Sequence, residues 1–98
     1  MPEASTEALQ DAIRHLHGCE SRFVETVAIT EQFNGVTVWD GDVQVFDLIG
    51  HPEAERAYVW SYETEGERRR FIAVLHAPPV DSPHKAVQAA ILSEQENV

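Results

Sequence analysis

The chain has 98 residues, of which 43% are hydrophobic, and its 17 acidic and 7 basic residues give a formal net charge of −10. This length predicts a single domain over residues 1–98 with one modest core, and the apolar fraction argues against disorder. No apolar run approaches the roughly 20 residues of a membrane-spanning helix, and the first residues lack the pattern of a secretory signal. The acidic balance opposes binding to nucleic acid or to anionic membranes.

The charge and the cysteine content also bear on partners and location. A net charge of this sign favours a basic protein partner, because the long-range field attracts positive surfaces. Cys19 is the only cysteine, so no internal disulfide can form. This fits a reducing compartment, and we expect a cytoplasmic protein.

The first predicted element is an amphipathic helix near the N-terminus. Ser5 or Thr6 can cap its first turn, and Gly18 stands where helices commonly end in a left-handed residue. Residues 1–4 are expected to be frayed. The apolar residues that recur at helical spacing are Ala8, Leu9, Ala12, Ile13 and Leu16.

From Arg22 the hydrophobic period changes to two, which predicts strands. The pair Asn34 and Gly35 is a strong hairpin signal, and Asp40 with Gly41 is a second turn-type pair. Two wide turns cannot lie so close together. Either residues 36–39 form a short strand of their own, or a glycine marks a bulge. We favour a hairpin at Asn34 and Gly35 with a bulge near Gly41, which leaves the strand boundaries between Phe33 and Ile49 open.

Residues 57–75 predict a second hairpin, and this hairpin is apolar on both faces. With its turn centred on Glu65 and Gly66, Trp60 lies opposite Phe71. A sheet with one wet face should alternate apolar and polar residues, so each face of this hairpin is expected to be covered. One face would carry Tyr58, Trp60, Tyr62, Phe71, Ala73 and Leu75, and the other Ala57, Val59, Ile72 and Val74.

The last predicted element is a helix with a clear start. Ser82 is a good N-cap, and Pro83 suits the first helical position. Residues 95–98 are expected to be frayed. A narrow apolar stripe follows the start, made of Ala86, Val87, Ala90 and Ile91.

The predicted fold is therefore an α+β two-layer sandwich: an antiparallel sheet of three or four strands, with the N- and C-terminal helices on one face. That face should be the one carrying Val59, Ile72 and Val74. The order of elements is similar to that of double-stranded RNA-binding domains, which run helix, three strands, helix. Those domains open the final helix with a lysine cluster, where this sequence has His84 and Lys85, so RNA binding is not expected.

No catalytic, metal or cofactor site is expected. His76 and His84 could form a catalytic pair, but no serine or cysteine nucleophile has a base placed beside it, so surface or capping roles fit the histidines better. Asp40 and Asp42 do not continue into a calcium-loop pattern, and turn chemistry explains them better. The sequence favours a non-enzymatic role.

The aromatic face of the second hairpin is the candidate functional surface. Left bare, it would be an unusually large apolar patch, which predicts a homodimer formed through the sheet. A protein-interaction or regulatory module is thus the first functional hypothesis. The alternatives are a small-molecule-binding protein with an aromatic pocket, and an acidic inhibitor that mimics nucleic acid. The candidate binding residues are Tyr58, Trp60, Tyr62, Arg70, Phe71 and His76.

Overall fold

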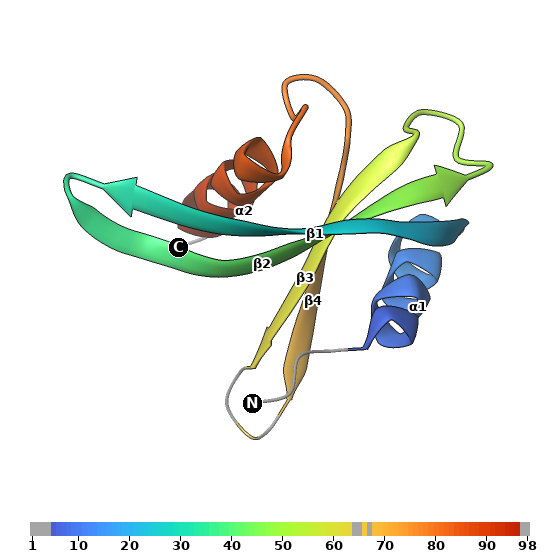
Figure 1. Cartoon of the computed structure of the whole chain (residues 1–98), viewed down its shortest axis with the longest axis horizontal. Helices are drawn as coiled ribbons and strands as arrows, with labels where there is room; N and C mark the ends of the chain where they lie inside the picture. The colour runs from blue at the N-terminus through green and yellow to red at the C-terminus, as the bar shows by residue number, and fades with distance from the viewer. Residues whose placement is uncertain (1–4, 64–65, 67, 97–98) are drawn as a thin grey trace.

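The computed structural model describes residues 5–63, 66 and 68–96, and its four strands form one antiparallel sheet in the order β1-β2-β3-β4. This confirms the α+β class and the antiparallel sheet between two terminal helices (Figure 1). The sheet has four strands. The elements are α1 (Thr6–His17), β1 (Glu20–Phe33), β2 (Val36–Ile49), β3 (Arg56–Glu63), β4 (Arg69–Leu75) and α2 (Pro83–Glu96).

Both ends of the chain were expected to fray. Residues 1–4 and 97–98 lie outside the described part, whereas residues 95 and 96 belong to α2. Neither helix in the described part of the chain is long and apolar enough to cross a bilayer.

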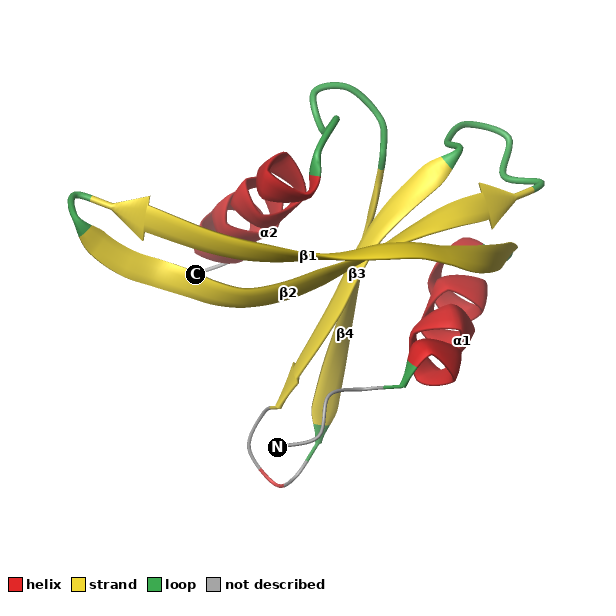
Figure 2. Ribbon diagram, in the orientation of Figure 1, coloured by secondary structure: helices red, strands yellow, loops and turns green. Residues whose placement is uncertain are grey.

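The sheet consists of two hairpins joined along a short seam. The first hairpin pairs β1 with β2 and turns at Asn34 (φ 53°) and Gly35 (φ 78°), which confirms the predicted turn, since both positions require positive φ. The seam pairs residues 44–47 of β2 with residues 56–59 of β3. Beyond the seam the two hairpins splay apart and cross, as Figures 1 and 2 show.

The register of the second hairpin differs from the predicted one by one residue. Trp60 lies opposite Ile72 rather than Phe71, and Glu63 lies opposite Arg69. A shift of one residue moves every side chain of a strand to the other face. Phe71, Ala73 and Leu75 therefore share a face with Ala57 and Val59, not with the aromatic row.

The two helices cover opposite faces of the sheet, so the prediction that both lie on one face is wrong. One core cluster joins α1 to β2, β3 and β4, and the other joins α2 to all four strands. Neighbouring β3 residues alternate between the clusters, as neighbouring side chains of a strand must. Both faces of the hairpin are apolar, and each has its own helix (Figure 2). The α1 cluster is Leu9, Ile13, Phe46, Leu48, Ala54, Ala57 and Val59; the α2 cluster is Ile29, Val43, Val45, Tyr58, Trp60, Ala86 and Val87.

Strand β2 runs without interruption through Asp40 and Gly41, so the predicted bulge does not lie at the glycine but three residues earlier, at Val38. Gly41 pairs in register with Ile29. The extra residues in the ladder are instead Val24 in β1 and Val38 in β2, where the register shifts. A continuous ladder with β1 overrides the local turn preference of an Asp-Gly pair.

The ends of the helices follow the sequence signals. The Ser5 hydroxyl accepts a hydrogen bond from the Ala8 amide at 3.1 Å, and Gly18 caps α1 with φ 69°. The Ser82 hydroxyl accepts from the Lys85 amide at 3.2 Å. These contacts confirm both predicted starts and the predicted end of α1.

Candidate functional site

Three aromatic side chains lie close together where β2 and β3 stop pairing. Past the pair of Gln44 and Val59 the two strands no longer pair, and Trp39, Trp60 and Tyr62 line the opening. The Trp39 and Trp60 rings meet edge to face, with centroids 5.7 Å apart and planes at 70°. We call this feature the aromatic notch, defined by Trp39, Trp60 and Tyr62.

Gly41 explains how Trp39 comes to lie in the notch. The two residues are two positions apart on β2 and share a face of the strand. A Cβ atom at position 41 would stand 3.2 Å from Cη2 of Trp39 and 3.5 Å from Cζ2, so the indole lies directly over the glycine backbone. An isolated glycine inside a strand often marks such a close approach. Here it lets a large ring lie flat along the strand.

Two cavities border the aromatic notch and share its three residues. The first has a volume of about 180 Å³ and adds the carboxylates of Asp40 and Asp42 to the aromatic walls, together with Leu9, Gly41, Gln44 and Ser61. The second has a volume of about 290 Å³ and is closed by apolar residues of β4 and α2, namely Ile72, Val87, Ala90 and Ile91. One side of the notch therefore carries acidic groups, and the other is hydrocarbon.

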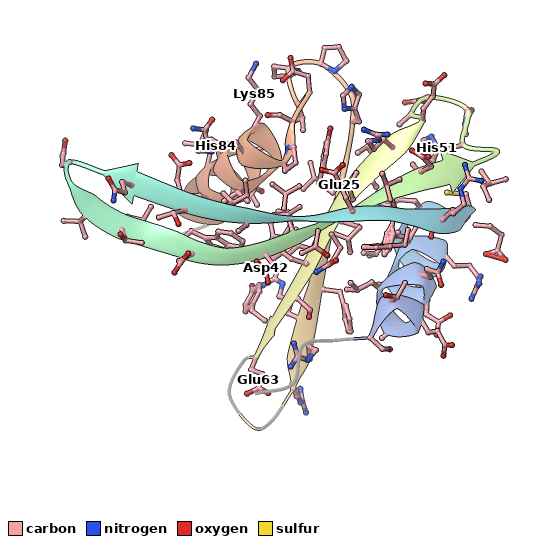
Figure 3. The ribbon with its side chains drawn as sticks, in the orientation of Figure 1. Glu25, Asp42, His51, Glu63, His84 and Lys85 are labelled. Atoms are coloured by element: carbon pink, nitrogen blue, oxygen red, sulfur yellow. The ribbon has the colours of Figure 1, made fainter. Side chains whose placement is uncertain are left out.

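The charged groups that line the first cavity are both acidic. Asp40 accepts a hydrogen bond from the Thr30 hydroxyl at 3.0 Å. Asp42 has no hydrogen-bond or ion-pair partner within the described residues, and it lies on β2 near the crossing of the hairpins (Figure 3). Two cations lie near the lining: Arg69 donates to Ser61 at 2.8 Å and pairs with Glu63 at 3.5 Å, and Arg70 lies opposite Tyr62 across the hairpin.

The six residues predicted to bind a ligand do not form one site. Trp60, 5% exposed, and the half-buried Tyr62 line the aromatic notch. Tyr58 is 2% exposed, and its hydroxyl lies 2.6 Å from Nδ1 of His76, towards the far end of the hairpin. Burial raises the pKa of Tyr58. The remaining two, Arg70 and Phe71, border a groove beside α1, but only Phe71 packs in the α1 cluster, whereas Arg70 lies opposite Tyr62 across the hairpin.

The aromatic face is not bare, because α2 packs on it. Ala86 and Val87 of α2 are fully buried in the same cluster as Tyr58 and Trp60. The cover expected from a second copy is thus supplied by the chain's own last helix. The apolar patch from which a sheet-face homodimer was predicted is internal.

Sequence reasoning missed Trp39 and set aside the two carboxylates as turn residues. The missed signal is the run Trp39-Asp40-Gly41-Asp42, in which the tryptophan and glycine alternate with acidic residues. In a continuous strand this places the ring on one face and both carboxylates on the other, and both border the first cavity because it lies at the edge of β2 that β3 leaves unpaired. Interpreting Asp40 and Gly41 as a turn breaks this two-residue alternation and so hides it from the sequence pattern.

Besides His76, three histidines make contacts within the fold. His17 Nε2 lies 3.0 Å from the Ala73 carbonyl oxygen, and His51 Nδ1 accepts from the backbone amides of residues 53 and 54. His84 Nε2 lies 2.5 Å from a carboxylate oxygen of Glu31. Among the described residues, no group of three or more His, Cys, Asp or Glu side chains is placed to hold a metal ion.

Comparison with protein-family models, with curated proteins and with solved structures finds no match to this chain.

Proposed function

We propose that this protein is a small-ligand-binding protein and that the aromatic notch is its binding site. The observation that carries the proposal is the meeting of Trp39, Trp60 and Tyr62 around two cavities at a split in the sheet. Ligand sites are typically concave and mostly apolar, with a few polar groups that set orientation. Cavities of about 180 and 290 Å³ lie below the usual range for drug-sized ligands, so the ligand is compact.

This site is a revised form of the aromatic pocket predicted from the sequence. Trp60 and Tyr62 remain in it and Trp39 joins them, whereas His76 lies elsewhere, and Arg70, which is opposite Tyr62, does not line either cavity. Three rings supply contact area at small entropic cost, because each aromatic side chain has only two rotatable bonds.

The intrinsic fluorescence of the protein tests the proposal. The chain has two tryptophans, and both line the notch, so a ligand bound there must change their emission. We expect compounds from a metabolite library to raise the melting temperature and to change the emission saturably. Trp39→Ala should abolish binding, whereas Leu92→Ala, at an exposed position of α2, should not. A library that yields no saturable binder would overturn the proposal.

A second candidate function is self-association through the first hairpin, and a separate observation favours it. Along residues 36–43, β2 pairs with β1 but with no other described strand, and Val36 and Val38 are 63% and 49% exposed. An open edge with apolar side chains favours pairing with another strand, and a second copy supplies an identical edge. Sedimentation should then show a dimer that Val38→Lys dissociates. A strict monomer at micromolar concentration would exclude this candidate.

A further inference from the structure

We infer that the ligand of the aromatic notch is a compact organic cation, with an alkylated ammonium group seated in the first cavity between the rings and the carboxylates of Asp40 and Asp42. This inference rests on the proposed function and names its ligand class. It needs three features that the first cavity combines: aromatic surface, two carboxylate-bearing residues in the lining, and a small volume.

The aromatic rings provide the first attraction for a cation. A cation above the face of an aromatic ring is attracted by the ring quadrupole, most strongly for tryptophan. Two of the three rings at the notch are indoles, and their planes meet at 70°. A group that contacts several rings at once must be rounded. An alkylated ammonium group has that shape.

The carboxylates provide the second attraction, which is electrostatic. The first cavity is lined by Asp40 and Asp42 and by no lysine or arginine among the described residues. Asp42 has no partner in that part of the chain, so its charge is available to a ligand. Two arginines lie near the lining. Arg69 donates to Ser61 and pairs with Glu63, so its charge is partly compensated, and Arg70, opposite Tyr62, is exposed to solvent. The net charge of −10 adds a long-range field of the same sign.

The walls distinguish an alkylated cation from a metal ion or a bare ammonium. A metal ion or a primary ammonium must replace strongly held water with several oxygen ligands, and the two indole walls offer none. Alkyl groups around nitrogen require no hydrogen bonds and gain from apolar contact. A volume of about 180 Å³ suits a headgroup rather than an extended molecule.

The decisive comparison is choline against 3,3-dimethylbutan-1-ol, which has the same shape with carbon in place of the charged nitrogen. We expect choline to bind about tenfold more tightly, as measured by tryptophan emission and calorimetry. Asp42→Asn should reduce choline binding about threefold to tenfold and leave the alcohol unchanged. Glu25→Gln removes the same charge from an exposed position of β1 and is the matched control. Asp42 is exposed, so its substitution should leave the fold intact.

The outcomes separate this inference from the proposed function. Equal binding of the two compounds, or binding of neutral library compounds alone, overturns the cation while leaving the binding function standing. Failure of every compound overturns both. A peptide with one trimethyllysine, compared with the free amino acid, then identifies the source. Tighter binding of the peptide assigns a modified protein side chain, and equal or weaker binding assigns a free metabolite.

Discussion

The two core clusters lie on opposite faces of the sheet and share no buried residue, so they should stabilise the fold independently. Ile13 in the α1 cluster and Val87 in the α2 cluster are both fully buried. We expect the losses in the free energy of unfolding caused by Ile13→Val and Val87→Ala to add to within about 0.5 kcal/mol, because separated sites without shared partners behave additively.

The sizes of the two losses follow from the groups removed. Ile13→Val deletes one buried carbon and should cost about 1 kcal/mol. Val87→Ala deletes two and should cost about 2 kcal/mol, from lost burial plus the cavity left behind. A domain of this size holds about 5–15 kcal/mol in total, so a double variant that loses about 3 kcal/mol remains folded.

Urea unfolding of the parent, the two single variants and the double variant gives the coupling energy. The matched control cycle combines Ile13→Val with Val59→Ala, an identical truncation at a fully buried valine of the α1 cluster. There we expect a coupling of about 0.5 kcal/mol or more, because both changes fall in one packed cluster. A coupling above about 1 kcal/mol between Ile13 and Val87 would show that the helices share one core, which would refute the two-sided arrangement.

Three further predictions concern a cap, a turn and an ionisable group. Ser82→Ala should lower the unfolding free energy by about 1 kcal/mol in thermal melts, whereas Ser93→Ala, exposed on the same helix, should change it little; equal effects would exclude the capping role. Gly35→Ala, at φ 78°, should cost about 1–2 kcal/mol in urea unfolding, and a neutral result would contradict the turn. Because burial raises the pKa of Tyr58 above its ordinary value of 10.0, the folded state holds this proton more tightly than the unfolded state. Its contribution to stability is therefore complete below pH 10 and is lost as the pH rises through the folded pKa; Tyr58→Phe should flatten this alkaline decline in the unfolding free energy, and an unchanged slope would count against it.

Features set by neighbours along the chain could be predicted from the sequence. The Ser5 and Ser82 caps and the turn at Asn34 and Gly35 each depend on a few consecutive residues, and all three are present. The doubly apolar character of the second hairpin also correctly required a cover on each face.

The faces of the β4 residues could not be predicted, because they depend on the length of one loop. A four-residue connection pairs Glu63 with Arg68, whereas the structure pairs Glu63 with Arg69 across five. The one-residue difference exchanges the two faces on which the side chains of β4 lie relative to those of β3. It moves Phe71 away from Trp60 and thereby removes half of the predicted binding surface. Turn preferences near Gly66 do not distinguish the two lengths.

The aromatic notch escaped prediction for a different reason. Trp39 lies beside Trp60 only because β2 stays paired with β1 through Gly41 while it separates from β3. Both facts concern pairing between distant residues. The local pair of Asp40 and Gly41 predicts a turn instead of a strand. The hydrogen-bonded ladder with β1 overrides this preference, and a short window of sequence does not reveal that ladder.

The short seam between the hairpins has a consequence for how the chain folds. All strand pairings join sequence neighbours, so both hairpins and the seam can form from local contacts, each hairpin within about 1–10 μs. The longest loops are closed by the helices, since α1 contacts β4 and α2 contacts β1. Loop closure over such separations is costly in entropy. We therefore expect the two hairpins to form and join along the seam first. The two terminal helices should pack on the sheet last.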